Sequence, residues 1–443
     1  MIGARHFAPG GVFRQVVLLA MGLVLLIPLS GAGEEYSFDA AESVKKPYSF
    51  GGYGEFLPVF ADLDRQAAFY KLKFYNHGLP RTTGESNLKL QLEGSYEKGI
   101  AQLYGRTNSD FNNTYQGWDL DTRLYEGYLS VKPSASLDFI MGKKVMKWGK
   151  GYAWNPAAFI DRPKNPDDPE IPREGYAVAA ADYTKSFEGS LRTLSFTPVL
   201  LPVATDFNGN FGAKKHFNVA GKVYALLYDT DIDLMFLARG SKPARYGLDF
   251  SRNIRSNWEA HGEASFIVSH QKNVADAAGN DSRTTMDAKN FLLGTRYQTS
   301  TDAILIAEYY RNGGGYSHAQ MRDFVSFVDT AYSSYLANGS DAQLQKTLAS
   351  SPNSYGAMNP MRDYLYFRAT RPDPFGVLYL TPALTSIVNL DDGSLSLAPE
   401  VLYTRITNLE LRLKATAFLG SPGSEFGEKA ADFRLELRAR YYF

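Results

Sequence analysis

Apolar and polar residues alternate with a period of two through long segments of this chain, and this alternation constrains its fold more than any other feature. Residues 433–443 alternate without interruption, and the same pattern runs through residues 409–419, 258–266 and 88–93. Successive side chains of a β-strand point to opposite faces, so each segment has one apolar and one polar face. The chain is therefore predicted to be all-β.

Strand length and turn asymmetry separate a membrane barrel from a soluble sandwich, which also alternates. Many segments run about ten residues, the length that a tilted strand needs to cross a bilayer, whereas soluble strands are typically about five or six residues long. Short connections are found at 96–99, 132–136, 228–231, 253–257, 299–302 and 404–408, and long ones at 107–121, 149–174, 202–216, 272–287, 312–361 and 420–432. Short turns at one end and long loops at the other are typical of a transmembrane barrel.

The predicted fold is a transmembrane, antiparallel, up-and-down β-barrel with long external loops. Residues 87–443 supply about 17 strands, and residues 50–59 supply one more. Residues 67–75 also resemble a strand, but single-chain bacterial barrels have an even number of strands. We therefore assign residues 67–75 to the first external loop or to an extension of its hairpin, and predict about 18 strands, with 16 as the alternative.

The N-terminal residues predict export. Arg5 and Arg14 precede the apolar residues 16–29, and small residues follow at 30–33. This is the order of a signal peptide with cleavage near Ala32, and the apolar segment is shorter than the roughly 20 residues of a membrane-spanning helix. We predict a signal peptide at 1–32, a periplasmic segment at 33–48 and the barrel at 49–443.

Composition excludes several classes of protein. The sequence has no Cys, which rules out disulfides, thiolate metal sites, iron–sulfur clusters and covalently attached haem. Its 47 basic residues balance its 47 acidic residues, which argues against nucleic acid as a partner. No cofactor is predicted.

The C-terminal residues carry a resemblance to a known family. Tyr441, the terminal Phe443 and the apolar residues at every second position before them are similar to the signal that directs Gram-negative outer-membrane barrels to insertion. With the signal peptide and the alternation, the chain resembles the porin superfamily over nearly its whole mature length. The resemblance implies a bacterial outer-membrane location, contact with lipid and lipopolysaccharide, and recognition by the barrel-assembly machinery through Tyr441 and Phe443.

A second, looser resemblance covers one loop. Residues 147–156, followed by 161–163, look like a loop of exported barrels, some of which are porin partners of multihaem cytochromes.

Three functions follow as alternatives. The first is a channel for diffusion of small hydrophilic solutes or ions, and the second is a sheath around a cytochrome that would bring its own haem. The third is a barrel enzyme, which the sequence disfavours because it has no Gly-x-Ser-x-Gly, Walker A or His-Glu-x-x-His motif.

The long loop at 149–174 is the candidate constriction. Pro163, Pro166, Pro169 and Pro172 are spaced by three, the period of polyproline II, which predicts a stiff, extended segment. The predicted constriction residues are its charged side chains: Asp161, Arg162, Lys164, Asp167, Asp168, Glu170 and Arg173. The alternative is a charged surface loop.

Polar positions on the strands predict the wall of a pore. The predicted pore-lining residues are Lys89, Glu93, Glu259, His261, Glu263, Arg296, Arg368, Arg412, Lys414, Arg434, Arg438 and Arg440. Basic residues are concentrated on the last two strands, which predicts a mild preference for anions. Glu259, His261 and Glu263 could also suggest a metal site, but alternate residues of one strand lie about 7 Å apart, which favours polar lining.

The loop at 312–361 contains an expected helix. Met321, Phe324, Val325, Val328, Tyr332, Tyr335 and Leu336 recur at helical spacing. An amphipathic helix is therefore predicted, packed on the barrel rim, with plugging of the mouth or docking of a partner as alternatives.

Overall fold

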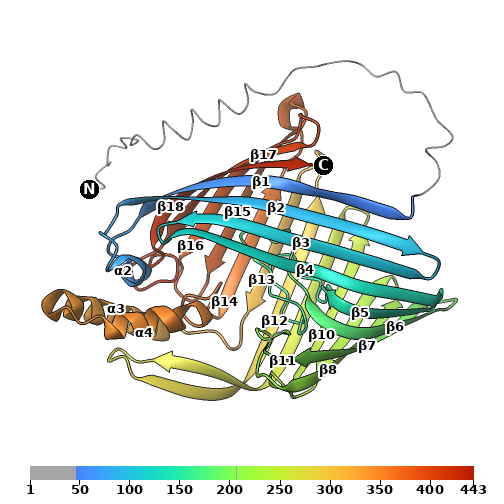
Figure 1. Cartoon of the computed structure of the whole chain (residues 1–443), viewed down its shortest axis with the longest axis horizontal. Coiled ribbons are helices and arrows are strands. Elements are labelled where there is room, and N and C mark those ends of the chain that lie inside the picture. The colour runs from blue at the N-terminus through green and yellow to red at the C-terminus, as the bar shows by residue number, and fades with distance from the viewer. Residues whose placement is uncertain (1–45, 206) are drawn as a thin grey trace.

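The computed structural model describes residues 46–205 and 207–443. The predicted signal peptide and residues 33–45 of the predicted periplasmic segment lie outside the described residues. The strands form one 18-stranded sheet in which each strand pairs antiparallel with the next. β1 pairs with both β2 and β18, so the sheet closes into a barrel (Figure 1). The predicted fold class and strand number are confirmed.

The strands have unequal lengths. Their bounds are β1 Tyr48–Leu63, β2 Thr82–Lys98, β3 Ala101–Thr114, β4 Gly117–Ser134, β5 Leu137–Lys144, β6 Tyr176–Ser186, β7 Leu191–Val203, β8 His216–Leu227, β9 Thr230–Leu237, β10 Arg245–Arg255, β11 Trp258–Ala275, β12 Asp281–Gln298, β13 Ile304–Arg311, β14 Asp363–Thr370, β15 Leu380–Asn389, β16 Leu395–Tyr403, β17 Leu409–Leu419 and β18 Ala431–Tyr442. The longest strands therefore extend far beyond the ends of their shorter neighbours.

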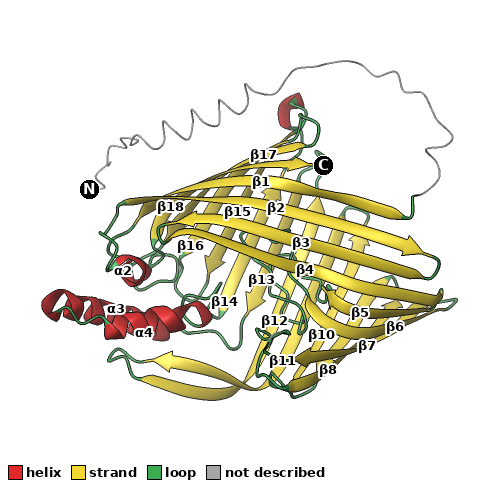
Figure 2. Cartoon of the chain, in the orientation of Figure 1, coloured by secondary structure: helices red, strands yellow, loops and turns green. Residues whose placement is uncertain are grey.

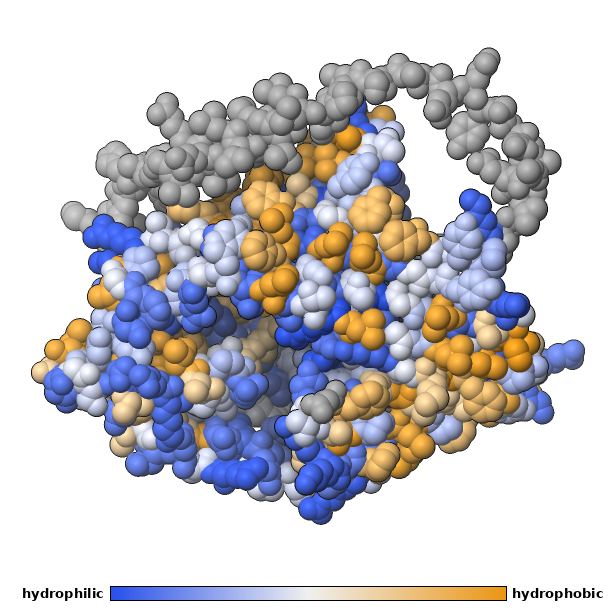
Figure 3. Space-filling model, in the orientation of Figure 1, coloured by the Kyte–Doolittle hydropathy of each residue, from blue (hydrophilic) through white to orange (hydrophobic). Residues whose placement is uncertain are grey.

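Alternation places apolar side chains outside and polar ones inside. On β17, Leu413 is 49% exposed while its neighbour Lys414 is 3% exposed. Figure 3 shows apolar residues gathered over the strands on the visible face of the barrel. The charged interior is largely covered, because residues such as Glu308 and Lys414 are at most 3% exposed. The apolar exterior is the surface that a bilayer requires of a spanning barrel.

The two ends of the barrel differ, as the connection lengths predict. All six predicted short connections are confirmed, and they share one end, which we call the short-turn end. The opposite end, the loop end, carries the long loops at 145–175, 204–215, 312–362 and 420–430. Another connection at the short-turn end, 371–379, contains the 3₁₀ helix η3 Pro374–Gly376.

Two predicted loops are strands instead. Residues 107–121 form the outer parts of β3 and β4, which meet at a turn of residues 115–116, with Phe111 stacked on Trp118 at 4.7 Å between ring centroids. Within residues 272–287, β11 continues to Ala275 and β12 begins at Asp281. Both hairpins project beyond the barrel at the loop end. Strands outside a bilayer need no apolar outer face, so the alternation that marks a spanning strand is lost there.

Three α-helices gather at the loop end (Figure 2). They are α2 Ala68–Phe74, α3 His318–Asn338 and α4 Ala342–Ser350, followed by the 3₁₀ helix η2 Ser351–Asn353. The expected helix in residues 312–361 is thus confirmed as α3, and residues 67–75 lie in the first loop as assigned, but as a helix. No helix among residues 46–205 and 207–443 is long and apolar enough to span a membrane.

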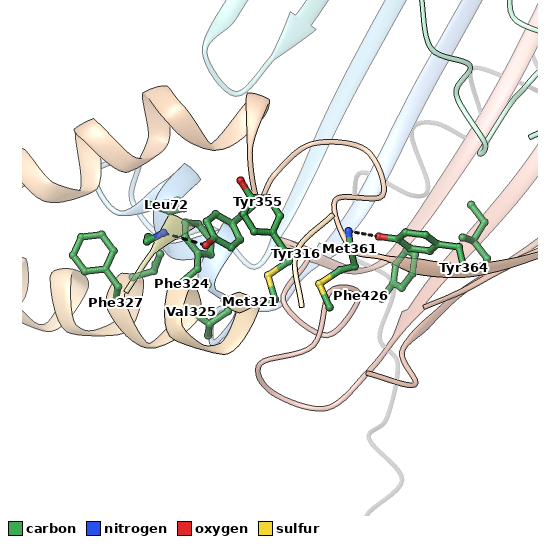
Figure 4. Packing of buried hydrophobic residues seen from close by; sticks show 14 of the residues in the cluster. Leu72, Tyr316, Met321, Phe324, Val325, Phe327, Tyr355, Met361, Tyr364 and Phe426 are labelled. Atoms are coloured by element: carbon green, nitrogen blue, oxygen red, sulfur yellow. Dashed lines mark hydrogen bonds between the residues drawn. The ribbon is translucent and has the colours of Figure 1, made fainter. Parts of the chain in front are cut away.

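The helices share an apolar cluster with the barrel. It includes Leu72 of α2, Met321, Phe324 and Val325 of α3, Tyr364 of β14 and Phe426 of the last loop (Figure 4). The Met361 backbone N–H donates to the Tyr364 hydroxyl at 2.7 Å, which joins the 312–362 loop to the wall (Figure 4). The apolar stripe of α3 therefore packs inward, on neighbouring loops and strands.

The seam between β1 and β18 tolerates little change. Gly52 exchanges two backbone hydrogen bonds with Phe443, both at 3.1 Å. A Cβ at Gly52 would lie 2.2 Å from the Gln91 carbonyl oxygen, whereas a Cβ at Gly54 would meet nothing within 4 Å. We expect Gly52→Ala to destabilise the closed barrel by about 1–3 kcal/mol, because the backbone of β1 beside the seam or of the neighbouring β2 must move.

Heat-modifiable mobility in detergent gels measures this effect. Gly52→Ala should lower the temperature at which the folded band disappears, and Gly54→Ala in the same strand should not. Equal unfolding temperatures for the two variants would contradict the role of the seam glycine.

Candidate functional site

The loop between β5 and β6, residues 145–175, lies inside the barrel, and we call it the crossing loop. Its apolar residues Phe159 and Ile160 are buried against one wall. That wall is formed by interior side chains of β7 and β9, including Val199, Leu201, Met235 and Leu237. The loop is therefore seated on a local apolar patch of an otherwise polar interior.

Two buried carboxylates of a second wall hold the loop by its backbone. Glu263 of β11 accepts from the N–H groups of Gly151 at 2.6 Å and Ala157 at 2.9 Å. Glu308 of β13 accepts from the N–H groups of Tyr152 and Ala153, the latter at 2.8 Å. Glycine is required beside these carboxylates, because Gly149 has a positive φ of 88° and its Cβ would lie 2.7 Å from Glu263 Oε1.

A third wall binds the far part of the loop through charge. The Asp168 carboxylate accepts from Arg412 Nη1 at 2.6 Å and from Arg438 Nη1 at 3.3 Å. Lys414 Nζ donates to the Asp167 carbonyl at 2.8 Å. Arg412 and Lys414 belong to β17 and Arg438 to β18. The crossing loop thus joins three separate parts of the barrel wall.

The other predicted constriction residues organise the loop itself. Asp161 accepts from the N–H groups of Met146 and Trp148, both at 2.8 Å. Arg162 Nη2 lies 2.7 Å from Glu174 Oε2. The remaining contacts are Lys164 Nζ to the Gly151 carbonyl at 2.5 Å, the Tyr152 hydroxyl to Glu170 Oε1 at 3.1 Å, and Arg173 Nη1 to the Arg162 carbonyl at 2.8 Å.

The prediction of a continuous polyproline II segment is wrong. Residues 165–171 form two successive turns, closed by hydrogen bonds from Asp168 N–H to Asn165 O at 3.1 Å and from Ile171 N–H to Asp168 O at 3.3 Å. The Asn165 side chain also accepts from Asp167 N–H at 3.0 Å. This local side-chain acceptor favours a turn over an extended chain, and the turn presents Asp168 to the third wall.

Trp154 connects the crossing loop to the 312–362 loop. Its indole N–H donates to Asn359 Oδ1 at 3.1 Å. Its ring stacks on Tyr310 at 5.1 Å and contacts Tyr364 and Tyr366, each at 5.9 Å between centroids. The two longest loops are therefore packed as one unit inside the mouth.

The predicted pore-lining residues do not share one environment. His261 and Glu263 face the interior but are each only 3% exposed, because the crossing loop covers them. His261 Nε2 lies 2.8 Å from Glu308, and Nδ1 lies 3.5 Å from Glu259. Three further predicted lining residues face the interior away from these contacts: Lys89, Glu93 and Arg296. Lys89 lies 3.4 Å from Asp110, and the Tyr104 hydroxyl lies 3.0 Å from Glu93. Arg296 pairs across the sheet with Glu259.

The basic wall is largely neutralised. Nearly every arginine of the predicted wall lies beside a carboxylate: Arg368 with Glu400 at 2.6 Å, Arg412 with Asp168 at 2.6 Å, Arg434 with Glu436 at 2.6 Å, Arg438 with Glu410 at 2.6 Å and Arg440 with Glu55 at 2.6 Å. A preference for anions therefore cannot be argued from the count of basic residues on the last two strands alone.

Burial and neighbouring charges set the titration of loop residues. Burial favours protonation of Asp168, but Arg412 and Arg438 outweigh it and hold the Asp168 pKa below its usual value. Burial, with a contribution from Arg173, lowers the pKa of Lys164. Asp168 is thus a fixed negative charge at neutral pH.

Several functional residues were missed or undervalued in the sequence. On β13, Glu308 is a charged residue between the apolar interior residues Ile306 and Tyr310. A single carboxylate on an otherwise apolar strand face was the sequence signal that could have marked Glu308 as a functional residue. Asn359 and Trp154 gave no local signal of their pairing. Among residues 46–205 and 207–443, no group of three or more His, Asp or Glu side chains is arranged to hold a metal ion.

Comparison with known proteins rests on structure. No protein family matches the sequence, and no curated protein resembles it. OccAB1 of Acinetobacter baumannii is similar with a TM-score of 0.51 and 10% identity, over 89% of this chain and 96% of that one. A triple mutant of Rhodopseudomonas blastica porin has a TM-score of 0.44 and 10% identity, over 89% of this chain and 100% of that one. The chain shares the barrel fold of OccAB1.

Proposed function

We propose that this chain is a channel of the bacterial outer membrane through which small hydrophilic solutes diffuse. The observation that carries the proposal is the crossing loop, which lies across the interior of a closed barrel and is tied to three parts of its wall. A loop so held narrows the interior of the barrel. Pore dimensions and wall charge then set which solutes pass.

The surroundings of the barrel follow from the same proposal. Its apolar exterior faces outer-membrane lipid and, in the outer leaflet, lipopolysaccharide. Tyr441 and Phe443 serve as the signal for the barrel-assembly machinery. Support comes from Phe443, which takes part in the seam through its hydrogen bonds with Gly52.

A sheath around an inserted cytochrome is the weaker alternative. A sheath needs an interior free for the inserted protein, and here the crossing loop occupies that space with Phe159, Ile160 and Trp148 each at most 2% exposed. An enzyme is also disfavoured. Among residues 46–205 and 207–443, the histidine in the interior network is His261, and its two ring nitrogens lie beside carboxylates rather than beside a hydroxyl nucleophile.

A mild preference for anions is also part of the proposal, and it now rests on interior cations that have no carboxylate partner. Within the described residues, Arg245 near the loop end has no carboxylate within ion-pair distance, and its Nε has no hydrogen-bond acceptor. Lys414 binds a carbonyl rather than a carboxylate. Cations without partners attract anions into a narrow polar space.

Planar-bilayer recordings of the purified protein test the proposed function. We expect stable conductance steps and, on deletion of residues 163–172, larger steps, because the deletion removes the contacts of Asp167 and Asp168 with the wall. A control deletion of residues 277–279 shortens a hairpin tip outside the barrel. Absence of steps in folded protein, unless a co-purified partner is present, would favour the sheath instead.

A further inference from the structure

A cavity of about 710 Å³ with polar and aromatic lining residues lies at the loop end, between the outer part of the β11–β12 hairpin and the 312–362 loop. The hairpin is fixed over it at several points. Ala275 N–H donates to the Tyr355 hydroxyl at 3.2 Å, and Lys346 of α4 lies 2.8 Å from Asp281. The turn at Gly279 packs so closely on α3 that an added Cβ would lie 2.1 Å from the Phe327 ring. The cavity is therefore a built chamber with a roof held in place.

Positive charge dominates the chamber. Lys272, Arg283 and Lys346 line it as cations, against one lining carboxylate, Asp281, which Lys346 neutralises. His270 also lines it, and burial together with the neighbouring Arg245 and Lys272 lowers its pKa and keeps its imidazole neutral, so that it offers a hydrogen bond and no charge. Lys272 is 7% exposed and donates to the Gly315 carbonyl at 2.8 Å and to Gln320 Oε1 at 3.3 Å. Within the described residues no carboxylate pairs with His270, Lys272 or Arg283. Buried cations are normally paired, so this chamber is suited to an anion.

The rest of the lining offers neutral hydrogen-bonding groups. The amides are those of Gln271, Asn273, Asn312, Gln343, Asn353 and Asn359. Tyr316, Phe324 and Tyr355 are stacked on one another, at 3.9 Å and 4.3 Å between centroids, and form one rigid side of the chamber (Figure 4). Amides bind hydroxyl groups as donors and acceptors. A hydroxylated anion would therefore satisfy both parts of the lining.

The chamber is one hydrogen bond from the crossing loop. Asn359 lines the chamber and accepts the indole N–H of Trp154 in the crossing loop. A solute held in the chamber is thus beside the narrowed part of the interior. On the proposed channel function, this is where a solute would be concentrated before passage.

We propose that the chamber is a binding site for a small, hydroxylated anion, such as a sugar phosphate or a sugar acid, which it captures at the loop end before passage. Lys272, Arg283 and His270 bind the oxyanion, and the amides bind the hydroxyl groups. A chamber of this volume accommodates a ligand of roughly disaccharide size or smaller.

Glucose 6-phosphate is the probe, added to one side of a bilayer containing the oriented wild-type channel. We expect brief current blockades when it is added at the loop end, weaker blockade by inorganic phosphate, and none by glucose. The double variant Lys272→Met/Arg283→Gln should weaken binding about tenfold or more, since charge-assisted hydrogen bonds are lost. The single variant Arg283→Gln, at an exposed residue, should weaken binding by a smaller factor. It keeps the test valid if the substitution of the buried Lys272 impairs folding.

The matched control is Lys132→Met/Arg192→Gln, which removes the same charges at the short-turn end and should leave blockade from the loop end unchanged. Blockade by glucose as strong as that by glucose 6-phosphate would overturn the site, and so would blockade that neither Arg283 variant alters. Either result, obtained with ordinary conductance, would leave the proposed channel function intact. If the protein conducts no current, calorimetric binding of glucose 6-phosphate to wild type and to Arg283→Gln decides the site independently. Wild-type binding that Arg283→Gln weakens supports the site, and no binding, or equal binding, overturns it.

Discussion

Replacing Glu263 and Glu308 together by alanine is expected to raise the single-channel conductance, on the order of twofold or more, by releasing the crossing loop. The double substitution removes the acceptors of four backbone N–H groups. Hydrogen bonds to a charged group contribute about 1.5 kcal/mol or more each. Their total, about 6 kcal/mol, is close to the free energy that changes the ratio of a bound to a released conformation from 99:1 to 1:99. The part of the loop around residues 151–157 should therefore leave the second wall for much of the time.

The control for this prediction is Glu93→Ala, which removes an interior carboxylate that contacts Tyr104 rather than the crossing loop. The isosteric pair Glu263→Gln/Glu308→Gln should lie between wild type and the alanine variant, because each amide oxygen still accepts. Each variant is first shown to retain the heat-modifiable folded band. An alanine double variant that folds and conducts as wild type does would refute the anchoring role.

Substituting Asp168 by asparagine is expected to shift the channel towards anions. Asp168 neutralises Arg412 and Arg438, and its lowered pKa keeps it charged at neutral pH. Removing one negative charge leaves those guanidinium groups with excess positive charge. A unit charge about 7 Å from a passing ion is worth about 0.6 kcal/mol in water, or about threefold in local anion concentration. The same charge lowers the local potassium concentration about threefold, so the chloride-to-potassium permeability ratio should rise by about the product of the two factors, roughly seven- to ninefold.

Reversal potentials in a potassium chloride gradient measure the ratio. The matched variant Asp168→Asn/Arg412→Gln restores the net charge and should return the ratio towards wild type, and high salt should reduce the difference through screening. A reversal potential unchanged in folded, conducting Asp168→Asn would mean that ions do not pass near the third wall.

Parts of this architecture follow from sequence because they repeat. Every spanning strand must present an apolar face to lipid, so alternation such as that of Leu409, Leu411 and Leu413 fixes which side each residue occupies. Parity then excludes residues 67–75 as a strand, and the structure forms α2 there. The outer parts of β3 and β11 escape this reasoning, because strands exposed to water on both faces are free of the constraint.

The contacts of the crossing loop could not be predicted in the same way. The prolines and charges marked the loop, but its partners are more than a hundred residues away, as Glu263 is from Gly151. Which cations remain unpaired depends on pairings such as that of Arg440 with Glu55, which join the two ends of the barrel sheet. Net charge on a strand is visible in sequence, whereas neutralisation requires the closed barrel.

Glu263 and Glu308 grip the crossing loop by main-chain N–H groups, and this has a consequence for how the protein can diversify. Apart from the glycines at 149 and 151, where a Cβ would strike Glu263 or neighbouring atoms, and the exclusion of proline from the donor positions, the anchor places no demand on side-chain identity. On the second wall, the position of the loop and the side chains that it presents to the interior are thus encoded separately. If the proposed channel function holds, mutation of residues 152–157 can revise selectivity while their main-chain anchor to Glu263 and Glu308 stays in place.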